Sequence, residues 1–140
     1  FKLASFVRWP APIADGEPFR ICIAGRGDIA GLLAAFANGK QIENRPVSVL
    51  ELGTAQPQLA ANCRMLFLGR GAKTAATLIS ATTGEPVLIV TDRTSGTRGG
   101  VVEFVEQGGK VRLALDQRQA TARKLALDSE LFNVAAEVER

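Results

Sequence analysis

Histidine and tyrosine are absent from this 140-residue chain, and cysteine occurs only twice. The missing histidine removes the commonest general base and metal ligand, and the missing tyrosine removes a further proton donor. Histidine-dependent catalysis and a zinc site of cysteine and histidine are therefore excluded. Ser95 and Ser129 also lack a lysine at a recognisable spacing that would activate them as nucleophiles. We expect no catalytic residues, no metal and no cofactor.

Long apolar runs are also missing. No stretch approaches the ~20 apolar residues that a membrane helix requires, so we expect no insertion into a membrane. Hydrophobic residues make up 46% and charged residues 22% of the chain, which is typical of a globular fold. The net charge is +3, but the basic residues are scattered, without the cluster and interleaved aromatics that indicate nucleic-acid binding. The length predicts a single domain over residues 1–140.

Short apolar runs alternate with segments of helical periodicity over the first two thirds of the chain. The runs are rich in β-branched residues and bounded by glycine, as buried strands are. Strands that alternate with helices form right-handed crossovers around a mainly parallel sheet. The sequence therefore predicts an α/β fold, a three-layer sandwich whose sheet is flanked by helices. The predicted strands are 19–24, 47–52, 64–68 and 87–90, and the predicted helices are 29–36, 56–62 and 72–79, the last with Ala72, Ala75, Ala76 and Ile79 on its inner face.

The pattern changes after Asp92. Two apolar runs, 99–106 and 110–115, flank Gly108 and Gly109, and this predicts a C-terminal antiparallel hairpin. Asp116 is placed to cap a short helix. The closing and opening segments both carry apolar residues at helical spacing, the opening one as far as Pro10, where a helix must end. These residues are Leu131, Val134, Ala135 and Val138 at the end and Leu3, Phe6, Val7 and Trp9 at the start.

One motif points to a cofactor. Gly25, Gly27 and Ala30 match G-x-G-x-x-A between a predicted strand and a predicted helix. Glu51 ends the next strand, and in a dinucleotide-binding fold such glycines approach a pyrophosphate while the carboxylate binds the ribose. Asp28 opposes this interpretation, because it places a negative charge where the phosphate would lie. A nucleotide- or dinucleotide-binding Rossmann-like module is therefore the alternative hypothesis, and a capped turn is the simpler one.

Two further segments are weaker candidates for ligand sites. The segment 69–74 is similar to a P-loop, but Ala72 stands where that motif requires the glycine before the lysine. Asp92 follows a predicted strand at its carboxyl end, where ligands of α/β proteins bind, and Arg93 and Arg98 share its loop. These residues predict either a pocket for an anion or small ligand or, more simply, a solvated loop.

Cys22 lies within the apolar run 19–24, and Cys63 directly precedes the run 64–68. As buried thiols they would behave as small apolar residues. As a disulfide they would close a loop of about forty residues and stabilise the fold by roughly 4 kcal/mol. The spacing does not distinguish these alternatives. The chain opens with Phe1 inside an apolar stretch, which predicts a processed N-terminus.

Six segments have a recognisable order and spacing. They are SFVRWP at 5–10, FRICIAG at 19–25, NCRMLFLG at 62–69, PVLIVTD at 86–92, GGVVEFV at 99–105 and GGKVRLALD at 108–116. The series is similar to the YfiR family over essentially the whole chain, above all in the F-V-x-W-P opening and the cysteine of F-x-I-C. The chain departs from the family near its end. Lys124 or Ala126 stands where a glycine usually precedes the final helix, and Asp128 and Ser129 replace a pair of serines.

The resemblance implies a non-enzymatic periplasmic regulator whose signal peptide has been removed. Such a protein is a homodimer that binds the periplasmic sensor domain of an inner-membrane GGDEF diguanylate cyclase, represses cyclic di-GMP synthesis, controls biofilm formation and responds to redox state. It also implies a disulfide between Cys22 and Cys63. The partner would contact apolar side chains left over once the sheet is covered, although each of these could instead belong to the core. They are Trp9, Leu125, Leu127, Leu131 and Phe132.

Overall fold

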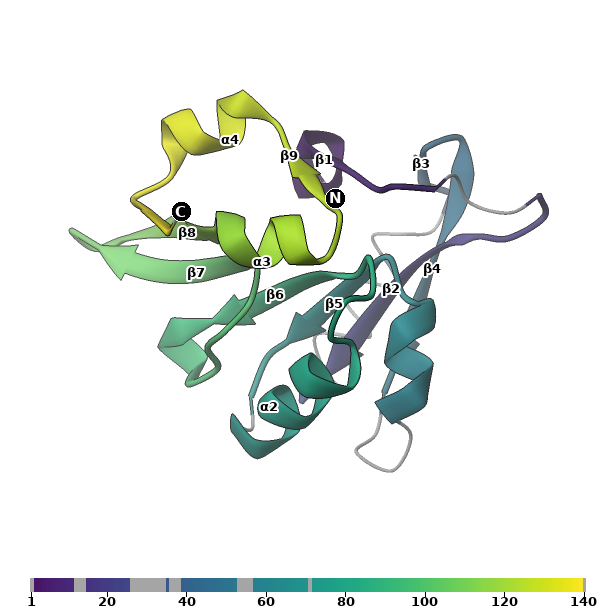
Figure 1. The fold of residues 1–140 in the computed structure, drawn as a ribbon, viewed down its shortest axis with the longest axis horizontal. Helices are drawn as coiled ribbons and strands as arrows, with labels where there is room; N and C mark the ends of the chain where they lie inside the picture. Colours follow the sequence, from purple (N-terminus) through teal and green to yellow (C-terminus); the bar gives the residue numbers. More distant parts are fainter. Residues whose placement is uncertain are drawn as a thin grey trace.

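The computed structural model describes residues 2–11, 15–25, 35, 39–52, 57–70 and 72–139. Within these ranges one mixed sheet (Figure 1) contains β2 (Phe19–Ala24), β3 (Gln41–Ile42), β4 (Arg45–Glu51), β5 (Met65–Leu68), β6 (Leu88–Asp92), β7 (Val102–Gln107), β8 (Lys110–Asp116) and β10 (Glu137–Glu139). Their order across the sheet is β10-β8-β7-β6-β5-β2-β4-β3. The pairs that join β4, β2, β5, β6 and β7 are all parallel.

The four predicted parallel strands are confirmed, and their bounds agree with the prediction to within two residues. In the centre of the sheet, Ile21 of β2 is level with Val49 of β4 on one side and Met65 of β5 on the other. Side chains on both faces of β2, β5 and β6 are buried or nearly so. Burial on both faces explains why these strands have continuous apolar runs rather than alternating patterns.

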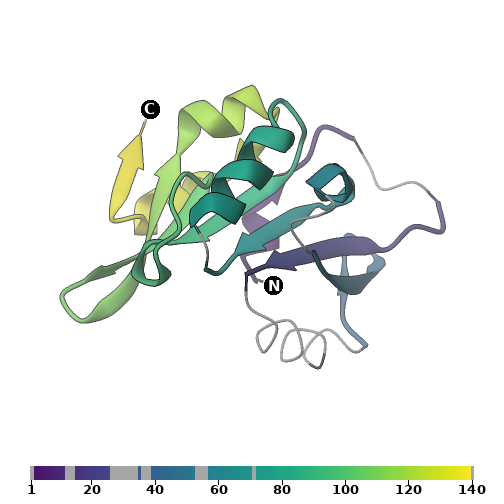
Figure 2. The ribbon, with the colours of Figure 1, turned by 90° about the horizontal axis from the view of Figure 1, so that it is seen from below.

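The sheet buries apolar side chains on both faces, so the core has two clusters. The larger cluster includes Phe19, Leu88 and Leu131 and is covered by the N-terminal and C-terminal segments of the chain. The smaller cluster is covered by the 3-10 helix η2 (Pro57–Asn62) and by the helix α2 (Ala72–Ala81), which Figure 2 shows packed against the sheet.

The inner face of α2 differs in part from the predicted one. Ala75 and Leu78 are buried, with 2% and 1% of their surface exposed, whereas Ala76 is exposed. The predicted position of Ala76 on the inner face is therefore wrong, because the helix is rotated so that Leu78 faces the sheet. The predicted helix 29–36 lies outside the described residues except for Ala35. The fold is thus α/β with a mostly parallel sheet, and the three-layer arrangement stays a prediction.

The opening segment does not form the helix that its spacing predicts beyond Phe6. The 3-10 helix η1 covers Lys2–Phe6, and the chain then becomes extended. The two-residue strand β1 (Val7–Arg8) pairs antiparallel with β9 (Ala126–Leu127), and Asp128 N donates to Phe6 O at 2.8 Å. The β-branched Val7 fits this pairing well, and hydrogen bonds to a distant segment override the local periodicity.

The chain between Asp92 and Asp116 ends in an antiparallel pair. β7 and β8 pair across Gly108 and Gly109, whose φ values of 60° and 76° suit the two-residue turn that joins such strands. The helix α3 (Gln117–Ala122) begins at Asp116, as predicted, with its carboxylate accepting from Gln119 N at 3.0 Å. The later strand β10 pairs parallel with β8 and forms this border of the sheet.

The closing segment is a second correction. The helix α4 covers only Ser129–Val134, and at Ala135 the backbone is extended, with ψ at 138°. Val138 lies in β10 opposite Leu115 of β8. The single helix predicted through Val138 is therefore wrong beyond Val134, because the β-branched Val138 pairs with the sheet instead. None of the described helices is long and apolar enough to cross a membrane.

Candidate functional site

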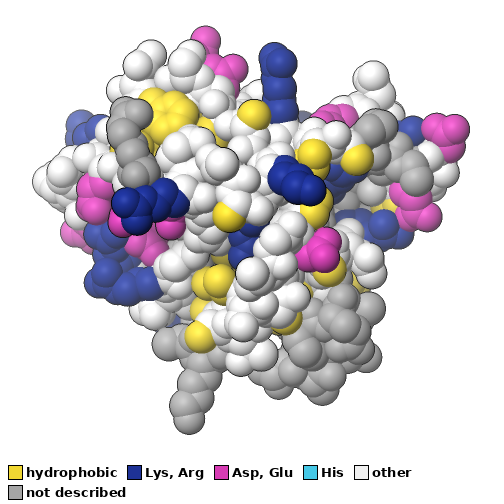
Figure 3. Space-filling view, in the orientation of Figure 1, with side chains coloured by type: hydrophobic (Ala, Val, Ile, Leu, Met, Phe, Trp, Pro, Cys, Tyr) yellow, Lys and Arg dark blue, Asp and Glu magenta, His cyan; other side chains and the backbone are white. Residues whose placement is uncertain are grey.

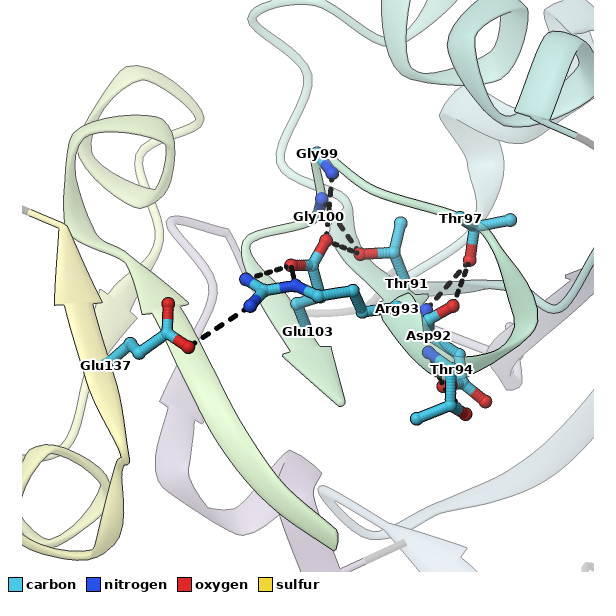
Figure 4. Close-up of polar contacts among 9 residues, drawn as sticks. All are labelled: Thr91, Asp92, Arg93, Thr94, Thr97, Gly99, Gly100, Glu103 and Glu137. Carbon is cyan, nitrogen blue, oxygen red and sulfur yellow. Dashed lines mark hydrogen bonds and ion pairs between the residues drawn. The ribbon is translucent and has the colours of Figure 1, made fainter. Parts of the chain in front are cut away.

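The loop after β6 is organised by Asp92. This loop begins with the turn η3 (Arg93–Ser95), and the Asp92 carboxylate accepts from Thr94 N at 3.0 Å and from Thr94 Oγ1 at 2.6 Å. Thr97 Oγ1 donates to Leu68 O at 2.7 Å and joins the loop to β5. Asp92 is therefore the N-cap of the turn that follows it, as Figure 4 shows. Its carboxylate is used for hydrogen bonds within the loop.

A buried carboxylate lies beside this loop. Glu103 of β7 is only 7% exposed. Its Oε2 accepts from Arg93 Nε at 2.9 Å and from Arg93 Nη2 at 2.7 Å. Its Oε1 accepts from Thr91 Oγ1 at 2.9 Å and from Gly99 N at 3.1 Å. A charge can be buried here because it is both paired and fully hydrogen-bonded.

Arg93 also bridges two strands of the sheet. Its Nη1 donates to Glu137 Oε2 at 3.1 Å, so one guanidinium contacts both β7 and β10 (Figure 4). The hydrogen bonds to Glu103 and to Glu137 raise the pKa of Arg93 above its ordinary value. Arg93 is therefore occupied by carboxylates of its own chain.

A pocket of about 340 Å³ adjoins these groups. Its charged lining consists of Arg93, Arg98, Glu103, Asp116, Glu137 and Glu139. Carboxylates thus outnumber guanidinium groups four to two. This balance does not suit an anion, so the structure gives no support to the anion pocket predicted from the loop.

Trp9 packs the N-terminal segment against the sheet. Its indole Nε1 donates to Arg64 O at 3.1 Å. Its ring meets Phe19 edge to face, with centroids 5.5 Å apart, and the Arg64 guanidinium lies 5.9 Å from the ring centroid. Such contacts add to the stability gained from burial alone. Trp9 is only partly buried, so one part of the side chain remains outward.

The other predicted partner-binding residues divide into buried and partly exposed ones. Leu125 and Leu131 are 3% and 2% exposed and belong to the larger core cluster. Leu127 and Phe132 pack against that cluster but are only partly buried. Val134, at the end of α4, is 58% exposed. Figure 3 shows a hydrophobic patch beside α4. From their exposure we define Leu127, Phe132 and Val134 as the α4 surface.

Arg123 is a buried charge that no motif in the sequence indicates. It is 3% exposed, and its guanidinium donates to Thr82 O at 2.8 Å and to Ile79 O at 3.3 Å. These carbonyls belong to the end of α2 and the turn that follows it, so Arg123 caps that helix from α3. Desolvation by burial lowers the pKa of Arg123. The contact holds the chain in place just before β9 and the α4 surface.

Cys22 and Cys63 form a disulfide, which confirms the pairing that the resemblance implies. Their Cα atoms are 5.9 Å apart and the residues are separated by 41 positions in the sequence. The bridge joins the middle of β2 to the residue two positions before β5. Cys22 is 0% and Cys63 3% exposed, so the bridge is part of the smaller core cluster.

Gly25 is explained by the chain's own packing. Its φ is +100°, and a Cβ at this position would lie 2.3 Å from Arg70 O. Glycine is therefore required where the end of β2 approaches the backbone of Arg70. Glu51 is exposed at the end of β4, and Gly27 and Ala30 lie outside the described residues. In the part of the chain that the structure describes, no feature favours the dinucleotide hypothesis.

These features define a mostly parallel α/β protein with a buried disulfide and an exposed apolar surface. The family model described as YfiR/HmsC-like matches residues 1–136, and the chain belongs to this family. Membership supports, at the level of the family, a regulatory and non-catalytic role in cyclic di-GMP signalling in the periplasm. A search of curated proteins finds no match.

Proposed function

We propose that this protein is an exported, non-enzymatic repressor of an inner-membrane GGDEF diguanylate cyclase. It binds the periplasmic sensor domain of the cyclase and represses the synthesis of cyclic di-GMP. It thereby also limits biofilm formation. The observation that carries this proposal is the family match over residues 1–136. The mature chain, after removal of a signal peptide, works as a homodimer in the periplasm.

The α4 surface is the proposed contact with the sensor domain. Apolar side chains that stay exposed together on a folded protein mark interaction sites. Val134 offers the most exposed of these side chains, and Leu127 and Phe132 extend the surface toward the core. The outward part of Trp9 is a further contact, on the segment that follows β1. Leu125 and Leu131 support this surface from beneath.

Repression needs only differential binding. The sensor domain exchanges between an active and an inactive conformation, and the repressor binds the inactive one more tightly. To move such an equilibrium from 1:99 to 99:1, the ratio of affinities must be about 10⁴, or about 5.5 kcal/mol. An apolar surface can supply this difference if it is buried in one conformation and left exposed in the other.

Redox sensitivity would act through Cys22 and Cys63, because the sequence contains no other cysteine. Burial of the bridge limits access of thiols, so the disulfide serves first as a stabiliser of the fold. Reduction would lower the population of folded repressor and thereby release the cyclase.

The test combines cellular and binding measurements. The protein is expressed together with a membrane GGDEF protein of the same cell, cellular cyclic di-GMP is measured, and calorimetry gives the affinity for the purified sensor domain. Val134→Asp should weaken binding to the sensor domain at least tenfold and raise cellular cyclic di-GMP, because the cyclase is no longer repressed. Ala76→Asp is the control, because Ala76 is an exposed apolar residue on α2, which covers the opposite face of the sheet from α4.

Each outcome has a separate meaning. Wild-type protein that neither binds the sensor domain nor lowers cyclic di-GMP contradicts the proposed function. If wild-type protein represses but Val134→Asp does so equally well, the function stands and the α4 surface is the wrong contact. Circular dichroism of both variants checks that they remain folded.

A further inference from the structure

Among the described residues, only the short strand β3 lies beside the outer side of β4, and it covers part of that strand. β3 pairs with Arg45 and Pro46, and Val47 N donates to Lys40 O at 3.2 Å. Beyond Val47 no strand among the described residues lies beside β4, and Figure 1 shows β3 alongside only the beginning of that strand. We call the uncovered stretch, Ser48–Glu51, the open edge.

The backbone groups of the open edge that point outward can be identified from the register. Leu52 N donates to Ile23 O at 2.8 Å, so even-numbered residues of β4 direct their N–H and C=O groups toward β2. The hydrogen bond of Val47 to Lys40 on the other side agrees with this alternation. Val49 and Glu51 therefore direct their N–H and C=O groups outward. Such groups form a template for another strand.

The side chains of the open edge also favour pairing. Leu50 is 41% exposed, and it lies in the middle of the open edge. Natural proteins usually protect a free sheet edge with charged side chains, bulges or a covering segment. At the opposite border, the exposed Glu137 and Glu139 of β10 provide such charges. The open edge has one exposed charge, Glu51, and beside it a large apolar side chain.

We infer that the open edge pairs antiparallel with the open edge of a second copy of this chain, with Leu50 opposite Leu50 of the second copy. The inference rests on the homodimer of the proposed function and names the surface that forms it. In this register Val49 of each copy exchanges both backbone hydrogen bonds with Glu51 of the other. The Leu50 pair is then of the non-hydrogen-bonded type, in which side chains lie closest, at a Cα separation of about 4.5 Å.

Two observations favour a second copy over a strand from another protein. β3 blocks β4 up to Val47, so only a short partner strand fits, and a two-fold axis at Leu50 makes the short stretch complementary to itself. The exposed Lys40 lies beside Val47, on the same side of β4 as the incoming strand. In the proposed register, Glu51 of the second copy lies beside Val49. Lys40 and that Glu51 are therefore about two residue steps, or roughly 7 Å, apart along the strand direction. Opposite charges therefore meet on both sides of the axis.

A disulfide-trapping experiment tests this register. Both native cysteines are already bridged, so Leu50→Cys introduces the only free thiol. Directly opposed Cβ atoms in such a pair are about 4.5–5.5 Å apart, within reach of a bridge after small adjustments. Ser48→Cys is the matched control, because two Ser48 residues would be offset by four positions, or roughly 13 Å. Val111→Cys, at 68% exposure, measures random collision.

Leu50→Cys should form a covalent dimer at least tenfold faster than both control variants at the same protein concentration. Equal rates for the three variants, or no dimer of Leu50→Cys, would overturn the inference. Sedimentation of the unmodified chain provides a second measurement. Such a short interface lies below the area of a standard complex, so we expect a dimer that dissociates on dilution. Leu50→Lys should keep the chain monomeric at concentrations where Val111→Lys still associates.

Repression of the cyclase is measured separately, so the two proposals can fail independently. A Leu50→Cys dimer in a protein that does not repress supports the interface and contradicts the proposed function. Repression by a wild-type chain that stays monomeric at every concentration supports the function and overturns the interface.

Discussion

The two borders of the sheet are constructed differently. At one border, β10 is a three-residue strand with exposed glutamates, and Arg93 links Glu137 of β10 to the buried Glu103. At the other border, β3 covers only the beginning of β4, and Leu50 is exposed beyond it. Among the described residues, exposed charges line one border, whereas at the other border part of β4 has no neighbouring strand, which is the basis of the proposed pairing.

The two borders also differ in how they are held to the rest of the sheet. On the β4 side, the neighbouring strand β2 carries the disulfide between Cys22 and Cys63. On the β10 side, hydrogen bonds and ion pairs among Arg93, Glu103 and Glu137 perform this role. A covalent bridge acts mainly on the unfolded chain, whereas an ion pair acts on the folded one. Different substitutions should therefore loosen each side.

The largest effect is expected from the bridge. The double substitution Cys22→Ala with Cys63→Ala should lower the free energy of unfolding by about 4 kcal/mol, because it removes a cross-link across 41 positions. Guanidinium chloride denaturation measures this change. Hydrogen exchange should then show the amides of β4 opening before those of β8. A loss below about 1 kcal/mol would contradict the proposed stabilising role of the disulfide.

The next effect concerns the β10 side. Glu103→Ala removes the acceptor of Arg93 Nε and Nη2, of the Thr91 hydroxyl and of Gly99 N, and leaves Arg93 with Glu137 alone. Breaking this partly buried pair should cost about 2 kcal/mol in the free energy of unfolding, measured by urea denaturation. Glu106→Ala is the control, because Glu106 lies exposed on the same strand. Equal losses in the two variants would show that burial of Glu103 contributes nothing.

The parallel strands could be predicted from the sequence because they carry their own signal. A run such as Val87–Val90 is apolar at every position, and a strand that is buried on both faces needs that pattern. The opening and closing segments could not be predicted in the same way. Val7 and Val138 fit both a helical spacing and a strand, and pairing with distant residues decides between these conformations.

The candidate sites were predictable to a lesser extent. The disulfide followed from the family resemblance and not from spacing, because distance along the chain does not fix which segments meet. Glu103 did carry a signal, since it is the one charged residue inside the apolar run 101–105. Arg123 carried none, because most of its partners are backbone carbonyls around the end of α2, and these are set by tertiary packing.

A third substitution should stabilise the turn between α3 and β9, outside both borders. Lys124 has a φ of +61°, a conformation that favours glycine, and the family's usual glycine can therefore be placed at this position rather than at Ala126. Lys124→Gly should raise the free energy of unfolding by about 0.5–1 kcal/mol in urea denaturation. Lys124→Ala keeps a Cβ and should show no gain. If both variants gain equally, relief of backbone strain is not the cause.

The smallest effect should change the local stability of β10 and leave the global free energy of unfolding almost unchanged. Glu137→Gln weakens an exposed ion pair with Arg93, and such pairs contribute about 0.3 kcal/mol, too little to shift global unfolding clearly. Local opening of β10 should nevertheless speed hydrogen exchange at Ala136, whose N–H donates to Leu113 O at 2.8 Å. Glu139→Gln, on the same strand, should leave exchange unchanged. Unchanged exchange in Glu137→Gln would instead mean that backbone pairing alone holds β10, and the charges would then serve only to keep other strands away.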